Sequence, residues 1–120
     1  MRIAVSSQGT DLSSKVDPRF GRASHFLTFD TSTESIEVFS NDQSVNSAQG
    51  AGIQTAENIA RMNVDVVVSG NFGPKAFRAL EAAGIKAALW AEGTVSEAIE
   101  LARNDKLKIC EKANVEGHWM

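Results

Sequence analysis

The sequence predicts an α/β domain with a mixed five-stranded sheet, and two observations point to this class. Three β-rich runs come first, and after them helical and β periodicity alternate along the chain. The first pattern is typical of a strand joined to an antiparallel hairpin, and the second of βαβ units with right-handed crossovers. The expected strand order is 3-2-1-4-5 with strand 2 antiparallel and helices on both faces, which is a ribonuclease-H-like arrangement.

Three strands are expected before the first helix. RIAVSS (Arg2–Ser7) is a short apolar run that stops near Gly9, as a buried strand does. FLTFDT (Phe26–Thr31) and SIEVFS (Ser35–Ser40) are separated by a short polar turn, which is typical of an antiparallel hairpin.

The pattern then changes to a helical period. The spacing of Ile53, Ala56, Ile59 and Ala60 predicts a helix of about three turns after the glycine-containing QGAG. VDVVVSG (64–70) is a continuous β-branched run, as expected for a strand that is covered on both faces.

Two further helices and one strand complete the order. Pro74 stands near the start of the second helix and Gly84 just past its end. IKAALWA (85–91) is the fifth strand. The last helix opens with the capping-box pair Thr94 and Glu97 and is expected to bury its apolar side chains, namely Val95, Ala98, Ile99 and Ala102.

Length and composition limit the class of protein. The 120 residues predict a single domain over 1–104, with a tail, 105–120, packed on it or extending from it. A net charge of −3 argues against a nucleic-acid binder, and no apolar run has the length of a membrane span or a signal peptide. Cys110 is the single cysteine, so no internal disulfide is expected and the cytoplasm is the expected compartment.

The topology predicts where a ligand would bind. In open α/β sheets ligands bind beyond the carboxyl ends of the strands, where the strand order switches, here between strands 1 and 4. Segments 8–24, 41–52, 70–75 and 90–94 should meet at that edge. Three of them lead into helix N-termini, where free N–H groups and the helix dipole favour an anion. Arg19, Arg22 and Lys75 add positive charge.

The candidate binding residues are cations, residues at helix starts, and neighbouring aromatic or polar side chains. Phe20, Phe72 and Trp90 would make the edge partly apolar. The full candidate set is Arg19, Phe20, Arg22, His25, Gly50, Gly52, Gly70, Asn71, Phe72, Gly73 and Lys75.

Several plainer explanations stay open for single residues. The arginines could pair with Asp11 and Asp17 in a purely structural loop. His25 could be a metal ligand, a proton donor or simply an exposed polar residue. Cys110, His118 and Met120 resemble soft ligands for Cu(I), but their spacing fits no familiar site, and a solvated or strand-extending tail is the explanation that we favour.

Catalytic motifs are not evident in the sequence. QGAGIQTAE has Thr55 where a dinucleotide fingerprint needs its third glycine, and SGNFGPKA lacks the Gly-Lys-Ser/Thr ending of a P-loop. RIAVSS carries no carboxylate for a nuclease metal pair, and no serine–histidine–acid set is apparent. We therefore expect no enzyme.

Three segments together resemble one known family. SSKVDPRFGRASHFLTFD, GAGIQTAENIARMNVDVVVSGNFGPKAFRALEAAGIK and TVSEAIELA are similar to the dinitrogenase iron–molybdenum cofactor biosynthesis family, and the resemblance spans residues 1 to 103. It implies the ribonuclease-H-like fold. The chain looks most like the orange-protein subgroup of sulfate reducers, which holds a molybdenum–copper sulfide cluster without covalent bonds.

The resemblance implies a non-catalytic carrier of an anionic molybdenum–copper sulfide cluster. One alternative is a chaperone or carrier of an iron–molybdenum cofactor precursor. Another is a regulatory module that binds a nucleotide, or an ATPase partner of the MinD-like kind or another cofactor-handling protein. Family members in the nitrogenase branch are expected to hold their cluster through histidine or cysteine, and here only His25 lies near the predicted edge.

Overall fold

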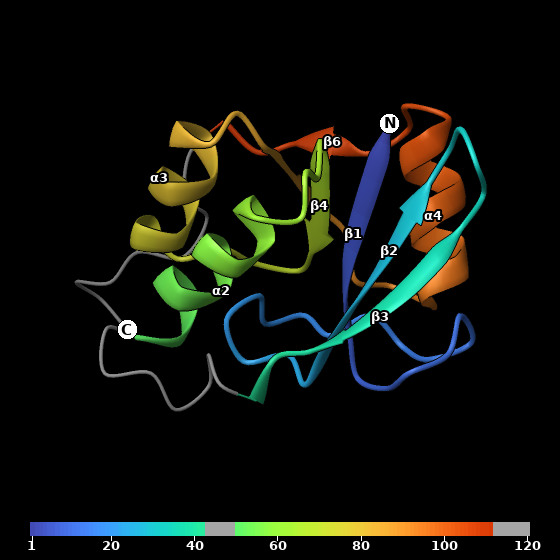
Figure 1. The fold of residues 1–120 in the computed structure, drawn as a ribbon, viewed down its shortest axis with the longest axis horizontal. Helices are drawn as coiled ribbons and strands as arrows, with labels where there is room; N and C mark the ends of the chain where they lie inside the picture. Colours follow the sequence, from blue (N-terminus) through green and yellow to red (C-terminus); the bar gives the residue numbers. More distant parts are fainter. Residues whose placement is uncertain (43–49, 112–120) are drawn as a thin grey trace.

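A single mixed sheet with helices on both sides organises the chain (Figure 1). The structure is a computed structural model that describes residues 1–42 and 50–111. Within those ranges the strands are β1 (Arg2–Ser7), β2 (His25–Asp30), β3 (Ile36–Ser40), β4 (Val66–Ser69), β5 (Lys86–Leu89) and β6 (Lys108–Ile109). The helices are α2 (Ala51–Ala60), α3 (Pro74–Ala82) and α4 (Val95–Arg103).

The observed sheet order, β3-β2-β1-β4-β5-β6, confirms the predicted fold and adds one strand. Strand β2 is antiparallel to both β1 and β3, whereas β4 is parallel to β1 and to β5. The extra strand β6 pairs antiparallel with β5 and lies in the segment that was predicted to be a tail. Two residues are too few to show a β periodicity, so the sequence pattern could not reveal this strand.

The C-terminal part of the described chain is held to the sheet through Cys110. Its backbone N–H donates to the Ala87 carbonyl at 2.7 Å, and the residue is 8% exposed. His118 and Met120, the other two members of the proposed copper set, lie outside the described residues. Residues 1–42 and 50–111 contain no group of three or more His, Cys, Asp or Glu side chains that could hold a metal ion.

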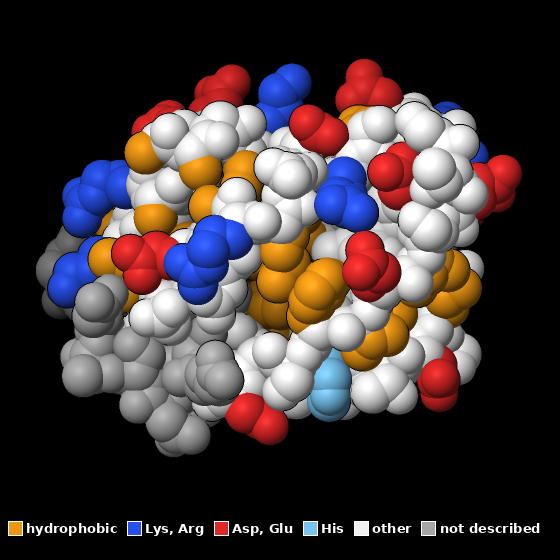
Figure 2. Space-filling model, in the orientation of Figure 1, with side chains coloured by type: hydrophobic (Ala, Val, Ile, Leu, Met, Phe, Trp, Pro, Cys, Tyr) orange, Lys and Arg blue, Asp and Glu red, His pale blue; other side chains and the backbone are white. Residues whose placement is uncertain are grey.

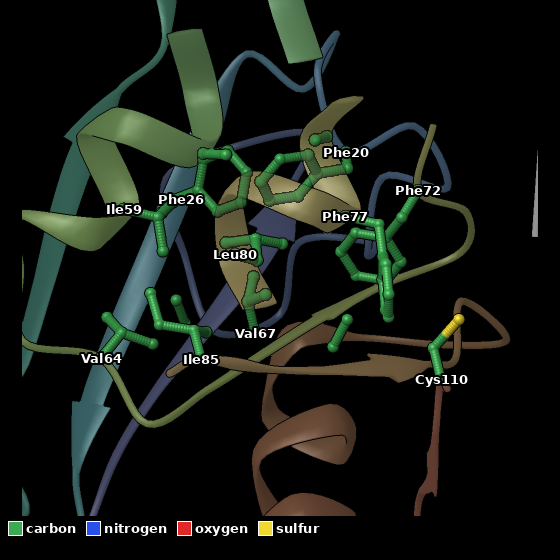
Figure 3. Close-up of a cluster of buried hydrophobic side chains, with 14 of the residues drawn as sticks. Phe20, Phe26, Ile59, Val64, Val67, Phe72, Phe77, Leu80, Ile85 and Cys110 are labelled. Carbon is green, nitrogen blue, oxygen red and sulfur yellow. The ribbon is translucent and has the colours of Figure 1, made fainter. Parts of the chain in front are cut away.

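Strand alternation divides the core into two layers. Ala4, Val67 and Ala87 pack toward α2 and α3, whereas their neighbours Val5 and Val68 pack toward α4. On the first side the aromatic rings of Phe20, Phe26, Phe72 and Phe77 gather beneath the helices (Figure 3). In the described part of the chain, no helix is long and apolar enough to cross a membrane.

The predicted capping box at the start of α4 is present. The Thr94 hydroxyl accepts from the Glu97 N–H at 3.3 Å, and the Glu97 carboxylate accepts from the Thr94 N–H at 2.9 Å. The Thr94 backbone N–H, followed by its hydroxyl, holds the pKa of Glu97 below its ordinary value of 4.5.

This lowered pKa predicts a pH-dependent contribution of Glu97 to stability. Because the folded-state pKa lies below the unfolded one, the contribution is complete above pH 4.5 and is lost as pH falls through the folded-state value. Glutamine keeps a capping box without the charge. We expect Glu97→Gln to lower the urea midpoint at pH 7 and to match the wild type at the acid end of the range. An equal difference at both pH values would contradict the prediction.

Candidate functional site

The long loop between β1 and β2 is anchored across the point where the strand order switches. The Asp17 N–H donates to the Ser6 carbonyl at 2.9 Å. The Asp17 carbonyl accepts the hydroxyls of Ser6, from β1, and Ser69, from β4, at 2.7 and 3.2 Å. Both serines are fully buried, so their hydroxyls fix the loop and are not exposed as nucleophiles.

Glycines bring this loop against the starts of two helices. A Cβ on Gly70 would lie 2.7 Å from the Pro18 Cα, and one on Gly21 would lie 2.7 Å from the Gly52 Cα. Real Cβ atoms essentially never approach other atoms so closely, so both positions need glycine. Gly70 and Gly21 therefore allow close contact between backbone segments of the chain. These contacts hold the loop against the segment that leads into α3 and against the start of α2.

The first turns of α2 and α3 offer an environment for an anion. Their N-cap residues are Gly50 and Gly73, neither of which has a side chain to cap the free N–H groups. Neither first turn carries an acidic residue. A Cβ on either glycine would meet nothing within 4 Å, and Gly50 has the positive φ of 108° that favours glycine. Pro74 at the start of α3 has no N–H to give.

These segments border a pocket of about 580 Å³. The loop after β1, the start of α2 and the start of α3 all contribute to it. Its lining is Arg19, Phe20, Gly21, Arg22, Gly50, Ala51, Gly52, Ile53, Asn71, Gly73, Pro74, Lys75 and Ala76. Eight of the eleven candidate residues are among these. Figure 2 shows Lys and Arg side chains exposed over α2 and α3 on the left of the view.

Five lining residues were not predicted from the sequence. They are Gly21, Ala51, Ile53, Pro74 and Ala76. Four of them belong to the first turn of α2 or α3, so the helix-start signals already identified would have found them if the whole first turn had been counted.

The aromatic candidates lie deeper than expected. Phe72 is fully buried and does not line the pocket. Phe20 lines it but is only 2% exposed, and its ring lies 5.1 Å from that of Phe72 and 5.6 Å from that of Phe26. The three rings belong to the buried cluster (Figure 3), and only Phe20 borders the pocket, where Ile53 and Pro74 provide the more accessible apolar lining. Gly70 does not line the pocket, because it faces Pro18.

His25 is not among the residues that line this pocket. It is the first residue of β2, and its neighbour Phe26 packs toward α2 and α3. Strand alternation therefore directs His25 to the α4 side of the sheet. There its Nδ1 lies 3.1 Å from the Ser24 hydroxyl oxygen.

The structure also differs from the expectation of three helix starts at the site. The first N–H groups of α4 are already occupied: Val95 donates to the Ser14 carbonyl and Ser96 to the Leu12 carbonyl, both at 2.9 Å. Glu97 adds a negative charge there. Trp90 packs against the core on the α4 side. Only α2 and α3, among the described helices, present their starts to the pocket.

The three cations of the pocket are not equivalent. Arg19 forms an ion pair with Asp17, with Nε 3.3 Å from Oδ1, so one of the two structural pairings considered above is present. No ion pair of Arg22, Lys75 or Asp11 is found in residues 1–42 and 50–111. Arg22 and Lys75 are exposed, and their charges face the pocket without an internal counter-ion from this part of the chain.

The fold and the site define a small α/β domain with a cationic pocket at the carboxyl edge of its sheet. The chain belongs to the dinitrogenase iron-molybdenum cofactor family, whose model matches residues 1–105. This confirms the resemblance that was drawn from the loop and helix-start segments.

Solved structures and a curated relative agree with this assignment. The apo form of the orange protein from Desulfovibrio gigas is 38% identical, with a TM-score of 0.91 over 95% of this chain and 96% of its own. A Thermotoga protein solved by NMR is 34% identical, with a TM-score of 0.82 over 97% and 98% of the two chains. A relative of unknown function from Methanocaldococcus jannaschii is 30% identical over 111 residues, which is 90% of each chain.

Proposed function

We propose that this protein is a non-catalytic carrier that binds an anionic molybdenum–copper sulfide cluster in the pocket between the β1–β2 loop, α2 and α3. The observation that carries the proposal is the convergence of two glycine-capped helix starts with Arg19, Arg22 and Lys75 on one pocket. The similarity to the orange protein supports the choice of guest. The cluster is the cargo of the protein, and no protein–metal bond is required to hold it.

The chemistry of the lining matches that of such a guest. Sulfide at the surface of a cluster is anionic and accepts hydrogen bonds, so backbone N–H groups and the two arginines would stabilise it. It is also soft and polarizable, so apolar neighbours such as Ile53 are compatible with it. Many weak contacts without a covalent bond permit release, as transfer to a recipient requires.

A second guest is favoured by the family to which the chain belongs. The description of the family names the iron-molybdenum cofactor, so a precursor of that cofactor is the alternative cargo. Its surface sulfides would bind to the same cations and N–H groups. In either case we expect the carrier to act in the cytoplasm, and to pass its cargo to a cofactor-handling protein or a MinD-like ATPase.

Reconstitution tests this function. The purified protein is mixed with tetrathiomolybdate and a copper salt, desalted, and assayed for visible absorption and for molybdenum and copper. We expect a visible chromophore that elutes with the protein and carries both metals, because the pocket retains the assembled cluster.

Four outcomes, two from this reconstitution and two from parallel tests with a cofactor precursor and with a nucleotide, separate the alternatives. Colour that elutes entirely with the small molecules would refute the molybdenum–copper proposal. Retention of an isolated iron–molybdenum precursor instead would favour the second cargo. Copper retained without molybdenum would indicate binding to thiol or imidazole groups rather than to the pocket. Chemical-shift changes at Gly50–Thr55 on addition of a nucleotide alone would favour a regulatory module.

A further inference from the structure

A buried carboxylate lies directly behind one of the pocket cations. Asp17 is 3% exposed, and its Oδ1 accepts the backbone N–H of Arg19 at 2.9 Å. The same carboxylate receives the Arg19 side chain, with Nε at 3.3 Å from Oδ1 and Nη2 at 3.4 Å from Oδ2. The Arg19 side chain is itself 62% exposed and lines the pocket.

The geometry of this pair is that of a loose contact. Charge-assisted hydrogen bonds between guanidinium and carboxylate groups are typically about 2.7–2.9 Å long, and both side-chain contacts here are longer. A guanidinium has five N–H donors, and Asp17 uses two of them. Arg19 therefore retains donors, and the solvent exposure, to turn toward an anion in the pocket.

Asp17 differs from a surface acid because its charge is fixed and shielded from solvent. Its N–H donates to β1 and its carbonyl accepts from β1 and β4, so its backbone is anchored at three points. Salt screens buried charges much less than exposed ones. A second anion next to Arg19 must therefore share the guanidinium with Asp17 and is repelled by its carboxylate.

We propose that Asp17 competes with the anionic guest for Arg19 and so limits how tightly the pocket holds its cargo. Asp17 is then a positioning residue that acts through Arg19 and favours release. The inference rests on the proposed function, because it concerns an anion in the same pocket. Removing the charge of Asp17 alone, with its hydrogen bond to the Arg19 N–H kept, is therefore enough to tighten binding.

Asp17→Asn separates the charge from the geometry. The asparagine Oδ1 can still accept the Arg19 N–H and keep the turn, while the negative charge is lost. We expect the Kd of tetrathiomolybdate, measured by equilibrium dialysis, to fall about fivefold, since Arg19 no longer divides its charge-assisted hydrogen bonds between a carboxylate and the guest. We also expect a steeper decrease of affinity with salt, because one more positive charge of the pocket is then uncompensated.

Two comparison variants identify the cause. Asp17→Ala loses the carboxylate and the turn together, so it should be less stable and should gain less affinity than Asp17→Asn. Compared with Arg19→Ala alone, the double variant Asp17→Asn with Arg19→Ala should lose most of the gain, because Asp17 acts mainly through Arg19. A purely structural role predicts that Asp17→Asn binds equally or more weakly and has an unchanged salt dependence, and either result would overturn the inference.

The wild-type protein provides a test that does not depend on folding of a variant. On titration with tetrathiomolybdate the ¹⁵Nε resonance of Arg19 should shift, because the guanidinium changes partner. An unchanged resonance during saturable binding would overturn the role of Asp17 and leave the proposed function intact. No binding of tetrathiomolybdate to the wild type, with or without copper, would defeat the proposed function itself.

Discussion

Replacing Arg22 and Lys75 together by alanine is expected to weaken binding of tetrathiomolybdate by about a hundredfold. Both side chains line the pocket, and neither has an ion-pair partner within residues 1–42 and 50–111. A hydrogen bond to a charged group contributes about 1.5 kcal/mol or more, so losing two gives a change of about two orders of magnitude in Kd. Equilibrium dialysis of the variant beside the wild type measures the change.

The stability of this double variant should be nearly unchanged, because exposed cations without partners contribute little to folding. Lys86 and Lys106 offer a matched control: both are exposed and neither lines the pocket. Their double alanine variant has the same net charge as the test variant and should bind almost as the wild type does. Equal weakening in both variants would mean that net charge, rather than the pocket, attracts the anion.

Gly70→Ala is expected to give the largest loss of stability. The added Cβ would lie 2.7 Å from the Cα, 2.8 Å from the carbonyl oxygen and 2.9 Å from the Cβ of Pro18. Two of these atoms belong to the backbone, and the adjacent Asp17 is pinned by Ser6 and Ser69. The loop must therefore shift as a unit, and we expect a loss of about 3 kcal/mol in the free energy of unfolding, measured with urea.

Gly73→Ala is the natural control for this substitution. Gly73 has an ordinary φ of −73°, and a Cβ there would meet nothing within 4 Å. Its stability should remain within about 1 kcal/mol of the wild type, the range of an N-cap change from glycine to alanine. A similar loss for both variants would show that helix starts, rather than the contact between Gly70 and Pro18, determine the effect.

The predictable part of this molecule is its topology, because periodicity reports it directly. The continuous β-branched run predicts β4 and the Thr94–Glu97 pair predicts the start of α4, and both elements are present in the structure. Once the strand order follows, the edge where the segments converge follows as well. Strand β6 could not be predicted, because it is defined by its pairing with β5, and two residues are too few to show a β periodicity.

The directions of side chains were harder to predict than their positions along the chain. Phe20 belongs to a loop, and nothing in DPRFGRA indicates that its ring turns down into the core while Arg19 and Arg22 line the pocket. The placement of His25 was accessible in principle, because alternation from Phe26 puts it on the α4 side. The occupation of the α4 start by the carbonyls of Leu12 and Ser14 depends on how the loop folds, and no local pattern contains it.

The proline at the start of α3 makes the two walls of the pocket unlike. The first turn of α2 provides backbone N–H groups from Ala51, Gly52 and Ile53 and no charged side chain, whereas Pro74 removes one donor from α3 and Lys75 follows it. One wall thus presents backbone dipoles and the other a positively charged side chain. A guest whose two ends differ in charge density would accordingly meet different surroundings at α2 and at α3, so its two orientations in the pocket would differ in free energy.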